Sequence, residues 1–468
     1  MQGKKKRVSL QNYLTKNKTE KMKSIVLLIC SVIATTLFAQ PTRLEMKDRY
    51  YMKGEVSAIT MEGSGNAKTV AEDIHGNFVF GGKALMGGKD YATDWTKKYN
   101  VQTGESSAET ANKTNSINDC IALPDGKVAC VANPFLNFSD VQNGEATTTN
   151  IPSSIVGFER LVYNPVAEHF VLFGVNKTND LWRPNVNKYQ IGGGYIESPF
   201  PKALLFGYNS FEDYHKNSFA TINNQNFAIW AYEADNKEVD QTALIGLVGY
   251  KEGRGGADKI DVKEILNTFV SDFKPYTRYE NTVYEEFYKV QWAISGIHSK
   301  EDGSFFVTVS FIHWTTTSSG KAGYQKGILG VEYVPSAKPA ITNTWVVFPW
   351  EVKEATSVQP KLEIKPYYTS YIGGNDIAVF DQETGHLFAI NSDLDACKST
   401  DELGTCQAKS KELQKWLIVN RLIARIEPTG YSLGFAHPNT APANGERKAI
   451  TLVQNVNGSE FKVIKFNP

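Results

Sequence analysis

The chain lacks the short motifs that mark the common enzyme active sites. It has no GxSxG segment, on which nucleophilic serine chemistry usually depends, and no GxxxxGK[ST] loop, which surrounds phosphate with backbone amides. Its 7 histidines include no HxH or HExxH pair, so a zinc site built from neighbouring residues is excluded. The sequence therefore predicts no catalytic residue, no metal site and no cofactor.

The chain also has few cysteines and no formal net charge. The 468 residues include 5 cysteines, none in the CxxC spacing of thiol-exchange enzymes, and 50 basic residues against 50 acidic ones. Without a positive excess, the chain has no electrostatic basis for binding nucleic acid. Hydrophobic residues make up 41% and charged residues 21%, which is ordinary for a folded globular protein.

Segment 1–39 departs from this balance. Its 8 basic residues precede or border the apolar run IVLLICSVIATTLFA at 25–39. A basic leader, a short apolar run and a small residue at its end are typical of a secretory signal peptide, and we expect cleavage between Ala39 and Gln40. Cleavage leaves 42 basic and 49 acidic residues in what we expect to be a single domain, 40–468. The expected location is the periplasm, the outer cell surface or the extracellular space.

Two alternatives remain open for the N-terminal segment. A permanent membrane anchor needs about 20 apolar residues, whereas this run is shorter and contains Ser31, Thr35 and Thr36. Met22 is an alternative start, because the segment from Met22 to Gln40 resembles a complete Gram-negative export signal by itself. After cleavage we expect no transmembrane segment.

Four cysteines follow the leader, and an oxidising compartment lets them pair in three ways. The segment CIALPDGKVAC at 120–130 favours one pairing. Pro124 and Asp125 suit the corners of a type I turn, and Gly126 suits the left-handed bulge position that follows. This hairpin sets Cys120 opposite Cys130, in a pair whose Cα atoms lie about 4.5 Å apart, which a disulfide tolerates.

By elimination, the second disulfide joins Cys397 to Cys406 across the polar loop KSTDELGT. The alternative is that all four cysteines are buried free thiols.

Short β-hairpins recur along the chain. Each pairs a polar or glycine turn with a β-rich run, as in 73–82, 123–133, 301–311, 382–391 and 455–466. Helical periodicity is rare, and its clearest case is DVKEILNTFVSDF at 261–273. The sequence therefore predicts an all-β fold with a helix packed on its surface.

A second repeat has an apolar strand that runs into an aromatic residue and then a turn. Its six copies, spaced by 42 to 83 residues, centre on Tyr99, Tyr163, Tyr208, Tyr250, Tyr333 and Phe380. In these stretches the chain resembles secreted bacterial β-propellers with divergent blades. The resemblance implies a β-propeller of about seven four-stranded blades, in which the final strand FKVIKF pairs with a strand near Ser57–Met61. A pair of β-sandwiches is the alternative.

Aromatic residues are concentrated in one third of the chain. Exposed rings stack on sugar faces or bind partner proteins, so these rings form a candidate ligand platform. The alternative is packing between blades. The rings are Trp314, Trp345, Trp350, Tyr367, Tyr368 and Tyr371.

Three functions remain open. The first is an exported non-catalytic binding or scaffold protein that recognises a protein or glycan at the bacterial cell envelope. The second is a glycan hydrolase or lyase, which two or more acidic side chains and a histidine at the propeller axis would indicate. The third is a structural component of a surface assembly, which a large exposed apolar patch or a free sheet edge would indicate. We favour the first, because an export signal and repeats occur without a catalytic motif.

We expect the exported protein to begin at Gln40. N-terminal sequencing of the protein recovered outside the cytoplasm checks this, and Ala39→Asp should block the cut because the peptidase needs a small residue there. An exported protein that still begins at Met1 or Met22 contradicts the prediction.

Overall fold

The computed structural model describes the following residues, all within the compact unit Tyr51–Pro468: 53–60, 66–86, 89–105, 110–112, 117–132, 135–150, 157–164, 169–178, 181–189, 195–199, 219–221, 228–234, 244–251, 254–274, 276–280, 286–300, 304–334, 340–355, 365–419, 424–425, 431–435, 450–455 and 460–467. The expected leader 1–39 and the repeat around Tyr208 lie outside these residues.

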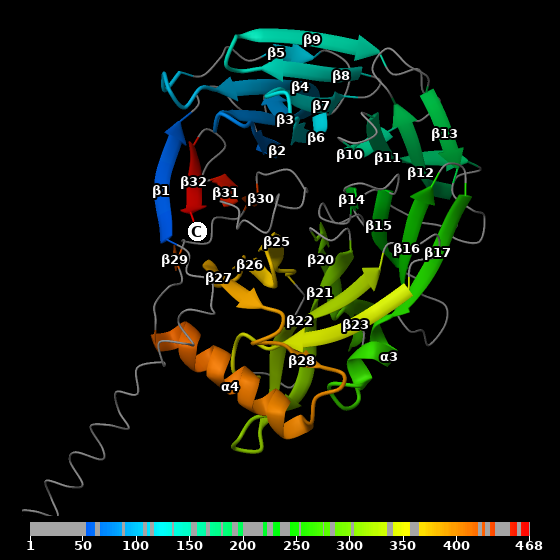
Figure 1. Cartoon of the computed structure of the whole chain (residues 1–468), viewed down its shortest axis with the longest axis vertical. Helices are drawn as coiled ribbons and strands as arrows, with labels where there is room; N and C mark the ends of the chain where they lie inside the picture. The colour runs from blue at the N-terminus through cyan, green and yellow to red at the C-terminus, as the bar shows by residue number, and fades with distance from the viewer. Residues whose placement is uncertain are drawn as a thin grey trace, which may run out of the picture. The chain divides into compact units, whose positions relative to one another are not determined.

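Antiparallel sheets dominate the described residues, and seven of these sheets have four or more strands (Figure 1). We number the seven as blades in chain order. Blade 1 contains β2 (Asn66–Glu72), β3 (Phe78–Met86), β4 (Lys89–Tyr99) and β5 (Thr110–Asn112). Blade 2 contains β6 (Ile117–Ala122), β7 (Val128–Ala132), β8 (Phe135–Asp140) and β9 (Glu145–Asn150).

The next two blades follow the same order. Blade 3 contains β10 (Gly157–Asn164), β11 (His169–Thr178), β12 (Leu181–Tyr189) and β13 (Tyr195–Pro199). Blade 4 contains β14 (Phe219–Thr221), β15 (Ala228–Ala234), β16 (Leu244–Lys251) and β17 (Arg254–Asp261). A separate hairpin, β18 (Tyr276–Glu280) with β19 (Glu286–Val290), precedes blade 5.

Blade 5 has extra strands. It contains β20 (Trp292–Ser299), β21 (Phe305–Thr316), β22 (Ala322–Val334) and β23 (Ala340–Val347), with β24 (Lys353–Glu354) beside β22 and β28 (Cys397–Lys398) beside β23. Blade 6 contains β25 (Tyr368–Gly373), β26 (Asp376–Asp381), β27 (His386–Asn391) and β29 (Ala424–Arg425). Blade 7 contains β30 (Tyr431–Phe435), β31 (Ile450–Asn455), β32 (Glu460–Asn467) and β1 (Lys53–Thr60).

The first strands of the blades form a closed cycle. β2 contacts β6, β6 contacts β10, and the series continues through β14, β20, β25 and β30 back to β2. Two sandwiches would not connect their first strands in this way. The expected all-β propeller is therefore confirmed.

The two ends of the described chain close the cycle within blade 7. β1 pairs antiparallel with β32 (Figure 1). Ser57 lies opposite Val463 in their register. The predicted pairing of FKVIKF with a strand near Ser57 is confirmed.

The hairpin at 120–130 has the predicted geometry. The Leu123 amide donates to the Lys127 carbonyl at 2.8 Å, and Gly126 has a φ of 88°. Only glycine adopts that left-handed conformation without strain. Cys120 lies opposite Cys130, and the two form a disulfide with a Cα–Cα distance of 4.1 Å.

Hydrophobic cores lie between neighbouring blades. Leu136 and Phe138 of blade 2 pack with Leu161 and Phe170 of blade 3. Across the junction of blades 1 and 7, the rings of Phe80 and Phe461 are 4.6 Å apart. Burying one such side chain stabilises the fold by roughly 1.5–3 kcal/mol, so each blade depends on both neighbours for much of its core.

The observed helix is shorter than the helix that the apolar pattern at 261–273 predicts. Helix α3 spans Val262–Asn267, and the Asp261 side chain caps it by accepting from the Glu264 amide at 2.9 Å. The helix ends early because the Asn267 side chain accepts from the Phe273 amide at 2.8 Å, which bends the segment into a turn. The apolar residues beyond α3 still pack against blade 5.

Three of the six aromatic rings proposed as a ligand platform are core residues. Trp345 and Tyr367 are fully buried, and Tyr371 is 6% exposed. All three belong to the core between blades 5 and 6, next to Phe306 and Phe388. For these three rings the structure supports the alternative, packing between blades.

A buried carboxylate connects three blades at their first strands. Asp119, on β6, accepts from the Thr69 hydroxyl of β2 at 3.3 Å and from the Leu161 amide of β10 at 3.0 Å. It also accepts from the Cys120 amide at 3.1 Å. Asp119, which is 8% exposed, thus satisfies donors from both neighbouring blades.

We expect Asp119→Ala to lower the free energy of unfolding by about 2–3 kcal/mol, because it leaves buried donors of two blades unsatisfied. Chemical denaturation measures the change. Asp125→Ala is the control, since this exposed turn residue accepts from the Lys127 amide and should cost less than about 1 kcal/mol. Equal losses for the two variants would contradict the role of Asp119.

Candidate functional site

Antiparallel pairing places the connections between the strands of a blade at two opposite ends of the strands, which are called edges here and differ from the open side of the outermost strand. If the strands of a blade are lettered A to D outward from its first strand, the A–B and C–D connections leave from one edge and the B–C connections from the other. We call these the AB edge and the BC edge. In blade 6 the C–D connection is unusually long, because β28 and helix α4 (Leu403–Val419) lie between β27 and β29.

Among the residues whose exposure the structure describes, the exposed large apolar side chains lie at one edge, the AB edge. All six lie in A–B or C–D connections, or at the strand ends that border them. They are Ile74, Val101, Val334, Ile341, Leu394 and Leu403. These six side chains belong to blades 1, 5 and 6, and apolar side chains scattered in this way are normal on a protein surface.

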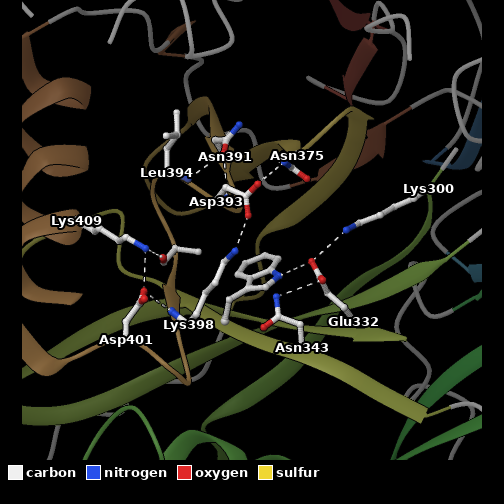
Figure 2. Close-up of polar contacts among 12 residues, drawn as sticks. Lys300, Glu332, Asn343, Asn375, Asn391, Asp393, Leu394, Lys398, Asp401 and Lys409 are labelled. Carbon is white, nitrogen blue, oxygen red and sulfur yellow. Dashed lines mark hydrogen bonds and ion pairs between the residues drawn. The ribbon is translucent and has the colours of Figure 1, made fainter. Parts of the chain in front are cut away.

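Leu394 lies in a loop that an asparagine side chain fixes (Figure 2). The Oδ1 atom of Asn391 accepts from the Asp393 and Leu394 amides, both at 3.0 Å. Its Nδ2 atom donates to Asp376 at 2.8 Å, and its amide donates to Asp395 at 2.8 Å. The backbone that carries the exposed Leu394 side chain is therefore held from both sides.

Asp393 connects this loop to two other segments. Its carboxylate accepts from the Asn375 side chain, in the A–B turn of blade 6, and from Lys398 Nζ at 2.7 Å. The hydrogen bond from Lys398 to Asp393 raises the pKa of that lysine. Figure 2 shows Asp393 between Asn375 and Lys398.

A disulfide and an ion pair anchor the other end of the loop. Cys397 is bonded to Cys406 at a Cα–Cα distance of 4.8 Å, as predicted, and joins β28 to helix α4. Asp401 accepts from the Lys398 amide at 3.0 Å and from Lys409 Nζ at 2.8 Å. The Lys398 amide, followed by the Lys409 side chain, lowers the pKa of Asp401.

Glu332 of blade 5 completes the network in Figure 2. Its carboxylate accepts from Lys300 at 3.1 Å, from the Trp345 indole at 3.1 Å and from Asn343 at 3.3 Å. Trp345 in turn lies opposite Lys398 in the β23–β28 register. The Leu394 loop is therefore attached to the C and D strands of blade 5.

The sulfurs of Cys397 and Cys406 and a carboxylate oxygen of Asp401 lie within 4.8 Å of one another. Metal binding would need thiolates, but both sulfurs are in the disulfide, and the Asp401 carboxylate already accepts from two donors. This cluster is a structural anchor.

The remaining three predicted aromatic rings lie at the BC edge, away from the Leu394 loop. Trp314, at the end of β21, donates to Gln291 at 3.3 Å. Trp350 packs against His386 with ring centroids 5.1 Å apart, and Tyr368 stacks on Phe380 at 6.3 Å. All three rings are partly exposed, so a role in glycan binding stays a prediction for them.

Among the described residues, the first strands of the blades carry few of the acidic side chains that a glycan hydrolase needs. Among their described side chains, the acidic ones are Glu72, which pairs with Lys465 at 2.9 Å, and Asp119, which bonds to two other blades. His298 is hydrogen-bonded to Thr369 of blade 6 at 2.9 Å. These groups connect elements of the fold, and none of the described ones forms an acid and base pair.

Sequence reasoning missed the Leu394 loop, because only its cysteines were identified. The available signal was the run Asn391–Asp395, in which Asn391, Asp393 and Asp395 alternate with other residues directly after a strand. Such side chains accept hydrogen bonds from backbone amides one to three residues away.

No protein-family model matches the chain, and no curated protein matches it in sequence. Several solved structures are similar in fold. The match to the structure of U3-55K covers 88% of this chain and 98% of the U3-55K chain, at 9% sequence identity and with a TM-score of 0.42. The β-propeller domain of the Trilobed protease from Pyrococcus furiosus covers 86% and 94% at 8% identity, with a TM-score of 0.38. The WD40 β-propeller domain of Doa1 covers 88% and 97% at 9% identity, with a TM-score of 0.42.

At such TM-scores, function does not transfer from these structures, and the fold assignment rests on the strand order and the contacts between blades. Among the described helices, none has the length and apolar character needed to span a membrane.

We expect Asn391→Ala to loosen the Leu394 loop, because the amides of Asp393 and Leu394 lose their acceptor. Losing about 1 kcal/mol of local stability should raise the hydrogen-exchange rate of these amides roughly fivefold. Mass spectrometry of peptic peptides measures the exchange. Asn343→Ala is the matched control, since it removes one bond to Glu332 outside the loop. Unchanged exchange at 393–394 would contradict the role of Asn391.

Proposed function

We propose that the chain is an exported, non-catalytic binding protein of the bacterial cell envelope that engages a partner protein through the AB edge of blades 5 and 6. The observation that carries the proposal is the exposed Leu394 side chain on a loop fixed by Asn391, Asp393 and a disulfide. The leader at 1–39 supports export.

Rigidity is the reason to favour a binding role for this loop. Ordering a mobile loop on association costs about 0.5–1.5 kcal/mol for each immobilised side chain. Here the backbone is ordered by hydrogen bonds before any partner binds. An exposed aliphatic side chain in a fixed position is a suitable anchor for an apolar pocket on another protein.

The exposed side chains also favour protein over glycan at this edge. Sugars bind aromatic faces, whereas the exposed large apolar residues here are aliphatic, as Ile341, Leu394 and Leu403 are. A glycan would find its rings at the BC edge, at Trp314, Trp350 and Tyr368. The AB edge therefore defines the primary binding surface, and the BC edge is the place to test the glycan alternative.

A photoreactive amino acid at position 394 should cross-link the partner protein in the envelope of the native host. The matched control places the same amino acid at Thr316, an exposed residue at the BC edge of blade 5. We expect a discrete adduct from position 394 and none from 316, and Leu394→Asp should abolish co-purification of that partner. Identical adducts from both positions, or none from 394, would contradict the proposal.

A further inference from the structure

The outermost strand of each blade has a free edge unless something protects it. Exposed edges pair readily with strands of other chains, and proteins protect them with charges, proline, short length or a covering segment. In this chain the protection is visible for the outer strands of six blades. β5 has 3 residues and β29 has 2, β13 ends in Pro199, β28 covers β23, and β1 and β17 contain charged residues in their sequences.

The outer strand of blade 2 has little such protection. β9 has the sequence EATTTN, with one charge, at Glu145, and no proline. Five of its six residues are exposed, and Thr149 is half-buried. Among the described strands, β9 pairs with β8 alone. Its last five residues, 146–150, carry no charge.

β9 is also held in place before any pairing. Lys98 of blade 1 donates to the Glu145 carbonyl at 3.1 Å, and the Thr148 hydroxyl donates to Asn137 of β8 at 3.0 Å. Asp140 closes the preceding turn by accepting from the Asn143 amide at 2.9 Å. The edge is therefore a rigid, extended template.

We propose that β9 pairs with β9 of a second copy of this chain. A two-fold axis perpendicular to the sheet makes two identical edges antiparallel. Centred on Thr148, it places Thr148 opposite Thr148 of the second copy and Thr147 opposite Thr149. Glu145 then lies beyond the centre and faces no like charge. Threonine pairs across antiparallel strands are favourable, and the two blades join into one continuous sheet.

The chain contains an example of the same kind of strand addition. The outer strand of blade 5, β23, accepts β28 from another part of the chain, through Trp345 opposite Lys398 and Val346 opposite Cys397. An isologous contact uses the same edge on both copies, so it closes as a dimer and forms no fibre. Six residues a side give an interface below the usual size of stable complexes. We therefore expect a reversible dimer that forms at micromolar or higher concentration.

Sedimentation velocity on the chain, expressed with its own N-terminal segment, tests the proposal. The wild-type protein should shift from monomer to dimer as its concentration rises into the high micromolar range. Thr148→Lys and Thr148→Glu each place like charges opposite one another at the two-fold axis, so each should weaken dimerisation at least about tenfold. An equal mixture of the two variants should dimerise again, because lysine then faces glutamate.

Thr316→Lys is the matched control, because it adds the same charge at an exposed strand residue of blade 5 and should leave dimerisation unchanged. Thermal unfolding of each variant shows that the fold is retained. A wild-type protein that stays monomeric, a dimer that the Thr148 variants do not weaken, or a mixture of the two variants that fails to dimerise overturns the proposal. The test is independent of the AB edge, since none of its variants alters that edge.

Discussion

The pairing of β1 with β32 is the constraint on which the rest of this structure depends. It joins residues 53–60 to residues 460–467, and the first six blades lie between these two segments in the chain. Each blade then has a neighbour on both sides, and the cores between blades are complete. Without it, blade 7 lacks its outermost strand, and the core that contains Ile59, Phe80 and Phe461 loses one wall.

Polar groups specify how the blades fit together, and the apolar cores supply most of the stabilisation. A buried carboxylate is costly unless its oxygens accept hydrogen bonds, so Asp119 is tolerated only where Thr69 and the Leu161 amide approach it from adjacent blades. The same holds between blades 5 and 6, where Thr369 bonds both His298 and Thr308 at 2.9 and 2.8 Å. Apolar packing alone would allow small shifts between sheets, and these bonds do not.

The residues at the turns and in the last strand made the hairpins and the closing strand predictable from the sequence. The long insertions were not predictable. In CIALPDGKVAC the turn residues determine the register within five residues of each cysteine, so the disulfide followed directly. Helix α4 gave no such signal: Leu413, Gln414 and Leu417 are its buried residues, and most of its other described residues are exposed. The aromatic platform failed for Trp345 and Tyr367 because a sequence shows ring content without showing which rings face the next blade.

At the AB edge, side chains that accept hydrogen bonds from backbone amides fix the turns in which exposed aliphatic residues lie. In three connections an aspartate or asparagine accepts from two backbone amides within the next four residues, and an exposed aliphatic residue lies in the same turn. The pairs are Asp73 with Ile74, Asn100 with Val101 and Asn391 with Leu394. Because folding has already ordered these turns, a partner that covers the aliphatic side chain gains its apolar area with little further loss of backbone entropy. The hydrogen bonds that complete the fold at this edge thus also order the turns that carry its exposed aliphatic side chains.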